Sequence, residues 1–189
     1  MKAFKKLILP LLLIATVLFS GCSQVDDLLS KQQSKFIDEV MTSFKEKGFE
    51  STVVEYFGAT EQEVKEELDL SPTDLELYDT ILKEMNYKIE KVVIDGNTSK
   101  VLVDITTVDT KKAMAETFKN IDEYSEDLKN VSSSEDDFRK ILVKQLKEKS
   151  PSYIDQKIEF TFVKEGKSWV LQWFDDENFL KLLGGLSEK

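Results

Sequence analysis

The feature that most constrains the fold of this sequence is a change in the spacing of its apolar residues. Before residue 87 these residues recur every three or four positions, as on one face of an α-helix, but from Tyr87 they alternate with polar residues. The helical spacing returns after residue 108, and a second alternating stretch begins near residue 156. Because two strand pairs lie between groups of helices, the sequence predicts an α+β fold in which helices cover one face of antiparallel strands.

Capping and turn residues predict where these elements begin and end. Ser71 followed by Pro72 is typical of a helix start, and Gly96 is typical of a hairpin turn. Helices are expected over 36–44, 60–68, 71–85, 110–128, 134–149 and 175–183, and strands over 87–94, 100–108, 156–164 and 168–174. The expected helix caps are Thr60 with Glu63, Ser71 with Asp74, Asp109, Ser134 with Asp137, and Asp175.

The N-terminus has the layout of a secretory signal peptide. Three lysines precede an apolar run over 7–19, and the small residues Ser20 and Gly21 then lead to Cys22, which is the only cysteine of the chain. This layout resembles a bacterial lipoprotein signal, which implies cleavage between Gly21 and Cys22 and a diacylglyceryl group on the thiol of Cys22. Two acyl chains on one residue attach a protein stably to a membrane.

The alternative is an uncleaved membrane-spanning anchor. Such a helix needs about 20 apolar residues, whereas Pro10 interrupts this run and Ser20 closes it. One departure from the lipoprotein pattern is Phe19, which stands three residues before Cys22, where leucine is usual. We therefore expect a signal peptide over 1–21, a short tether over 22–29 and a single domain over 30–189, at the outer face of the cell membrane.

Composition excludes several classes of function. Three of the 26 basic residues leave with the signal, so 23 remain against 36 acidic residues and the mature chain has a net charge of −13. A surface of this charge repels nucleic acid and anionic headgroups, so no nucleic-acid partner is expected. The chain has no histidine, and this excludes the usual catalytic dyads and imidazole metal sites. Its single arginine is Arg139. The prediction is no cofactor and no metal.

Several motifs together resemble Gram-positive lipoproteins of the DUF4878 and DUF5105 type, whose mature part is a nuclear-transport-factor-2-like domain. The motifs are the Ser20-Gly21-Cys22 signal, the hairpin 92–103, the turn 166–169 and the tail 179–186. The resemblance implies a curved, cystatin-like antiparallel sheet wrapped around a helix, often with a pocket between them, and here with an inserted helical pair over 110–149. It implies no catalytic residues.

Two further motifs are explained by structure alone. Gly166-Lys167-Ser168 lacks the earlier glycine of a phosphate-binding loop and leads into a strand, so it predicts a hairpin turn. The acidic runs 135–137 and 175–177 stand where helices are expected to begin, where carboxylates cap free amides and offset the helix dipole. We therefore favour capping over a calcium site at both runs.

The candidate binding residues lie on the expected strands. Tyr87, Phe160, Phe162, Trp169 and Trp173 are spaced to line a cavity between the sheet and the helices, although alternating aromatic residues more often form the core.

Asp104 projects from the opposite side of its strand to Val103. It is a candidate pocket carboxylate, and a solvated strand face is the alternative reading.

The sequence favours a non-enzymatic role. The first hypothesis is a lipid-anchored binding or interaction domain outside the cytoplasm, with the membrane as one partner and an unknown protein or small molecule as the other. The alternative is a small-ligand enzyme or carrier that uses a pocket between the sheet and the helices, with Asp104, Trp169 and Trp173 as candidates. A fully packed interior would argue against this alternative.

Overall fold

The computed structural model describes residues 22–119, 135–166, 168–172 and 175–185, with side chains from residue 26 onwards apart from 66–68. In chain order the elements are α1 (Cys22–Lys47), α2 (Phe49–Phe57), α3 (Glu61–Leu68), α4 (Pro72–Lys83), β1 (Asn86–Asp95), β2 (Thr98–Val108), α5 (Thr110–Lys119), α7 (Glu135–Glu148), β3 (Tyr153–Glu165), β4 (Ser168–Leu171) and α8 (Asp176–Leu182). The predicted α+β class is confirmed.

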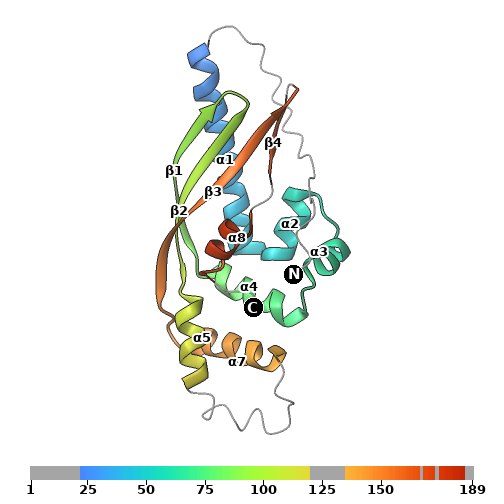
Figure 1. Ribbon diagram of the computed structural model, residues 1–189, viewed down its shortest axis with the longest axis vertical. Helices are drawn as coiled ribbons and strands as arrows, with labels where there is room; N and C mark the ends of the chain where they lie inside the picture. The colour runs from blue at the N-terminus through green and yellow to red at the C-terminus, as the bar shows by residue number, and fades with distance from the viewer. Residues whose placement is uncertain (1–21, 120–134, 167, 173–174, 186–189) are drawn as a thin grey trace.

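The four strands form one antiparallel sheet in the order β1-β2-β3-β4. Both expected hairpins are present, and between them β2 pairs along its whole length with residues 153–163 of β3. In Figure 1, α1 runs along the sheet, and α5 and α7 lie together at one end of the molecule. The register of β1 against β2 shifts between Ile89 and Lys91, which makes Glu90 the extra residue of a β-bulge.

Most helix starts follow the predicted caps. Thr60 and Glu63 form a capping box at α3, Ser71 and Asp74 form another at α4, and Asp175 caps α8. Pro72 occupies the first turn of α4, where a missing N–H costs no helical hydrogen bond. Ser134 and the second half of the helix expected over 110–128 lie outside the described residues.

The structure differs from the sequence-based expectation at two helices. Residues 22–29, expected as a tether, belong to α1, which begins at Cys22. The helix α2 was not predicted, because its start has no cap residue of its own: the N-cap is Gly48, with no side-chain hydrogen bond. Instead, Oδ1 of Asp79 in α4 accepts a hydrogen bond of 2.7 Å from the N–H of Phe49. A cap supplied by another helix has no local sequence pattern.

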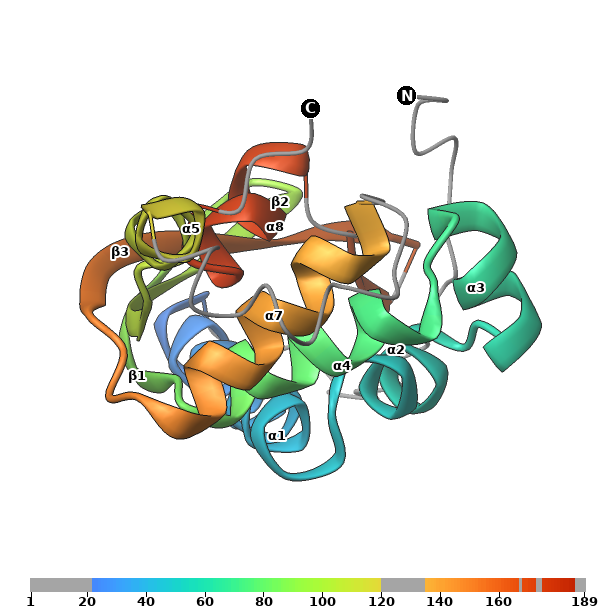
Figure 2. The ribbon, with the colours of Figure 1, turned by 90° about the horizontal axis from the view of Figure 1, so that it is seen from below.

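The main core fills the space between the sheet and the helices α1, α2, α4 and α8. Its centre is a group of aromatic rings in mutual contact: Phe44, Phe49, Tyr78 and Phe179. A second apolar cluster joins α4 and the end of β2 to the two helices at the far end of the molecule. Viewed from below, α7 lies alongside α4 (Figure 2). The second cluster consists of Leu77, Ile81, Val108, Ala113, Leu142, Val143 and Leu146.

The C-terminal end of α8 is fixed to the junction of β2 and α5. The hydroxyl of Thr107 donates to the carbonyl of Leu182, and that of Thr110 donates to the carbonyls of Leu183 and Gly184. Gly184 has a φ of +69°, and a Cβ added there would lie 1.7 Å from the carbonyl oxygen of Val108. A glycine is therefore required for this close backbone approach.

Candidate functional site on the open face of the sheet

The sheet face opposite the core carries polar side chains in rows that cross three strands. One row is Asn86, Thr106 and Asp155, and the next is Lys88, Asp104 and Lys157. The row between them is Tyr87, Ile105 and Gln156, whose side chains point to the other face because successive residues of a strand alternate. The predicted placement of Asp104 opposite Val103 is thus confirmed.

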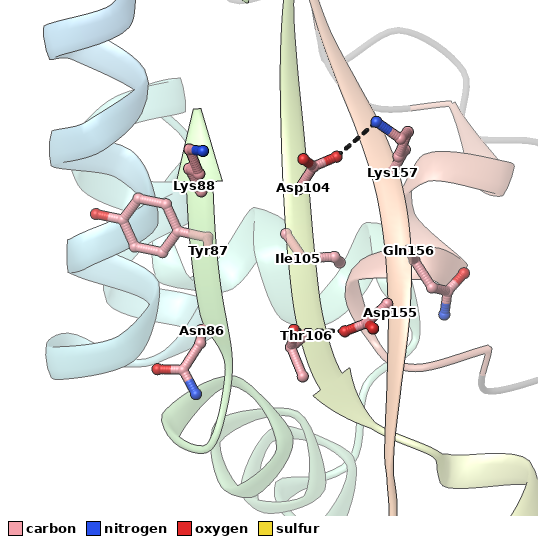
Figure 3. Close-up of a pocket in the computed structure, with 9 residues that line it drawn as sticks. All are labelled: Asn86, Tyr87, Lys88, Asp104, Ile105, Thr106, Asp155, Gln156 and Lys157. Atoms are coloured by element: carbon pink, nitrogen blue, oxygen red, sulfur yellow. Dashed lines mark hydrogen bonds and ion pairs between the residues drawn. The ribbon is translucent and has the colours of Figure 1, made fainter. Parts of the chain in front are cut away.

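These three rows line a pocket of about 550 Å³. It takes three consecutive residues from each of β1, β2 and β3, so its floor is the sheet itself and its polar groups stand in the two flanking rows (Figure 3). The side chains of Lys88, Asp104 and Lys157 come from neighbouring strands and carry charges in the order positive, negative, positive. Because the three strands pair in register, this arrangement is rigid at the backbone.

Lys157 forms ion pairs with two carboxylates. Its Nζ lies 2.8 Å from Asp104 Oδ1 and 2.8 Å from Glu90 Oε2. The hydrogen bond to Asp104 is the largest cause that raises the pKa of Lys157 above its ordinary value, and the hydrogen bond to Glu90 is the next largest. The ammonium therefore stays charged at all physiological pH values. The Lys157 side chain is 68% exposed, and the pairs are therefore screened by solvent.

Other polar groups of the pocket have fewer partners. The hydroxyl of Thr106 donates to Oδ1 of Asp155 at 2.6 Å, and among the described residues the charge of Asp155 has no ion pair. Within the described part of the chain, no hydrogen bond or ion pair engages the side chain of Asn86 or the ammonium of Lys88. The pocket therefore offers a cation on β1 and a carboxylate on β3 that the described protein charges do not neutralise.

Tyr87 lines the pocket through its backbone, and its ring points to α1 (Figure 3). The Tyr87 hydroxyl donates to Asp38 Oδ1 at 2.8 Å and lies 2.9 Å from Thr42 Oγ1. Burial is the main cause that raises the pKa of Tyr87 above its ordinary value. The residue therefore holds β1 on α1 and presents no acid or base to the pocket.

The other predicted pocket residues are core residues. Phe160 and Phe162 are 2% and 0% exposed, and Trp169 is 9% exposed, all within the main apolar cluster. They lie on the helix-covered face of the sheet, so the structure does not bring them together with Asp104. Trp173 lies outside the described residues. The described members of this set are thus part of the apolar core, which is the alternative that the sequence analysis gave for alternating aromatic residues.

Four of the residues that line the pocket were not predicted from the sequence: Asn86, Lys88, Asp155 and Lys157. Their positions depend on the pairing of β2 with β3, which links the two hairpins. The sequence placed each hairpin but contained no local signal for this pairing. The alternation of polar residues on each strand was the available signal, and it becomes informative only once the register is known.

The two acidic runs serve helix starts and ion pairs. At the start of α7, Glu135 pairs with Arg139 and Asp136 pairs with Lys140, each one helical turn away. Asp175 accepts a hydrogen bond from the N–H of Asn178 at 2.7 Å, as a cap does. No group of three or more acidic or cysteine side chains in the described ranges is arranged to hold a metal ion.

The groups that line the pocket are mostly polar and carry both signs of charge. No histidine lines the pocket, because the chain has none. The lining residues supply ammonium, carboxylate, amide and hydroxyl groups, which recognise polar and charged ligands.

Gly21 lies outside the described residues, and so does the side chain of Cys22. The helices that are described include none with the length and apolar character needed to cross a bilayer.

Comparisons with known proteins are sparse for this chain. No protein-family model and no curated protein matches it. Among solved structures, it is similar to the crystal structure of a candidate lipoprotein (YcdA) from Bacillus subtilis, with 18% sequence identity and a TM-score of 0.40. The likeness covers 80% of this chain and 47% of the other, so the chain spans about half the length of that protein.

Proposed function

We propose that the chain is a lipid-anchored binding domain at the outer face of the cell membrane, with a diacylglyceryl group on Cys22. The observation that carries this proposal is the N-terminal layout of three lysines, an apolar run and small residues that end at the only cysteine. The pocket on the open face of the sheet is its candidate binding site. The role is binding, with no catalytic step.

Two further features support an anchored domain that stands clear of the lipid. The helix α1 begins at Cys22, and among its described side chains Leu29 is partly buried against the core and Gln33 is the first to be fully buried, eleven residues or about 16 Å along the axis from Cys22. The mature net charge of −13 repels anionic headgroups. Attachment therefore depends on the acyl chains and needs no contact between the sheet and the bilayer.

The fold is compatible with the nuclear-transport-factor-2-like resemblance, which forms the finer part of this proposal. An antiparallel sheet packs against the long helix α1, as that resemblance implies. The helices α5 and α7 fall within the range 110–149 of the inserted pair.

The anchor is tested by the substitution Cys22→Ala in a Gram-positive host. The unaltered protein is expected in the membrane fraction, labelled by radioactive palmitate, with a mature N-terminus whose mass includes the diacylglyceryl group. Cys22→Ala should abolish the label and give either an unprocessed precursor or protein released to the medium. The neighbouring substitution Ser23→Ala keeps the thiol and serves as the matched control. An intact N-terminal methionine without acyl mass in the unaltered protein would refute the proposal.

A further inference from the structure

We propose that the pocket on the open face of the sheet binds a short zwitterionic peptide, with the peptide carboxylate on Lys88 and its ammonium group on Asp155. This inference rests on the proposed function as a binding domain, and it assigns a ligand class to the site. It concerns the face opposite the core and uses none of the aromatic residues expected from sequence.

The charges of the pocket favour a ligand that carries both signs. Asp104 and Glu90 already neutralise Lys157, at 2.8 Å each. Among the described residues, Lys88 remains as an unpaired cation on β1, and Asp155 remains as a carboxylate whose partner is the neutral hydroxyl of Thr106. An anion would meet Asp104 and Asp155, and a cation would meet Lys88 and Lys157. A zwitterion places each charge beside an opposite one.

The spacing of these two charges sets the length of the ligand. Lys88 and Asp155 stand on strands that flank β2 and in neighbouring polar rows. Two strand spacings of about 4.8 Å and two residues of about 3.4 Å separate their Cα atoms by about 12 Å along a diagonal. The side chains of Lys88 and Asp155 take up part of this distance, and the ligand spans the rest. Because an extended peptide advances about 3.4 Å per residue, this remaining distance suits a peptide of two or three residues.

The polar groups beside the two charges match a peptide backbone. Asn86 supplies an amide that both donates and accepts, and the oxygen of Thr106 can accept a further hydrogen bond. The side chains of Tyr87 and Gln156 point away from this space, so neither of them separates the two polar rows (Figure 3). The same orientation removes the Tyr87 ring as a stacking surface, which disfavours a sugar.

The test uses the full-length lipoprotein in nonionic detergent, with trialanine as the probe in calorimetric titrations. Trialanine is expected to bind with a dissociation constant of about 1 mM, as suits a shallow and exposed site. Amidation of its carboxylate or acetylation of its amine should weaken binding about 3- to 10-fold, and high salt should weaken it too.

Matched variants assign each contact. Lys88→Gln should weaken trialanine binding about as much as amidation does and leave the amidated peptide unaffected. Asp155→Asn should behave in the same way toward the acetylated peptide. The control is Lys91→Gln, an exposed lysine of β1 outside the pocket, which should change neither affinity.

Two outcomes would overturn the assignment: no heat of binding at tens of millimolar trialanine, or equal affinity for trialanine and its doubly blocked form. The blocked peptides provide this test even if a variant fails to fold. Membrane attachment through Cys22 is measured separately, so a failure here would leave the anchor intact, and loss of the anchor would leave this binding measurable.

Discussion

At the scale of single residues, Gly184 tolerates the least change. Its φ is +69°, which strains any residue that carries a Cβ. An added Cβ would also lie 1.7 Å from the carbonyl oxygen of Val108 and clash with it. We expect Gly184→Ala to lower the free energy of unfolding by about 3 kcal/mol or more. Urea denaturation measures this loss.

Gly96→Ala is the control. The φ of Gly96 is +57°, but no described atom lies within 4 Å of an added Cβ. This substitution should cost about 1–2 kcal/mol. Equal losses would show that the clash relaxes.

Asp79 is a carboxyl at the N-terminal end of α2, where it accepts the hydrogen bond of Phe49, and it has a pH-dependent effect on stability. Burial is the largest cause that raises the pKa of Asp79 above its ordinary value of 3.8, against the hydrogen bond from the Phe49 N–H. The folded state thus retains a proton that the unfolded chain releases, and this group lowers stability as pH rises from below 3.8 through its folded pKa. We expect Asp79→Asn, which keeps the accepting oxygen, to gain stability relative to the unaltered protein across that pH range.

The measurement for Asp79 is the difference in unfolding free energy between variant and unaltered protein, taken at several pH values from about 3 to about 7. The comparison variant Asp79→Ala removes the acceptor that caps α2, and it should lose about 1 kcal/mol because the Phe49 N–H is left without its partner. A flat pH profile for Asp79→Asn would show that burial does not perturb this carboxyl.

At the scale of elements, the only arginine of the chain fixes α7 to the start of α4. Arg139 Nη1 lies 2.9 Å from Asp74 Oδ1, and the Asp74 side chain is 8% exposed. Arg139→Met leaves this buried carboxylate without its cation, and it should cost about 1–2 kcal/mol, since the arginine is itself partly exposed. Thermal unfolding measures the loss. Lys35→Met is the control, because its pair with Glu39 is largely exposed and should contribute under about 0.5 kcal/mol.

The helices and strands were largely predictable from the sequence, whereas contacts between distant elements were not. Local patterns such as Ser71 with Asp74, and the alternation in β1 and β2, act within a few residues and gave the right elements. The cap of α2 and the ion pair of Lys157 with Glu90 join residues 30 and 67 positions apart. Such contacts depend on tertiary packing, so the fold class was predictable and the composition of the pocket was not.

At the scale of the whole molecule, charge repulsion opposes compactness. The full chain has a net charge of −10, which becomes −13 in the mature form that we propose, and the ion pairs among the described residues lie mostly at exposed side chains, where each contributes little. Raising NaCl from about 10 mM to about 150 mM shortens the screening length from about 30 Å to about 8 Å. We expect the melting temperature to rise by a few degrees in circular dichroism. A fall would mean that favourable ion pairs outweigh the repulsion.

The bulge at Glu90 has a consequence for proteins crowded in one plane. A strand at the end of a sheet can recruit the same strand of a neighbour, and confinement to a surface makes such encounters frequent. In β1, the irregular spacing at Glu90 and the exposed charges of Lys88, Lys91 and Asp95 disfavour continuous edge-to-edge pairing. Copies held side by side by the proposed anchor at Cys22 would therefore remain separate, with the open faces of their sheets accessible.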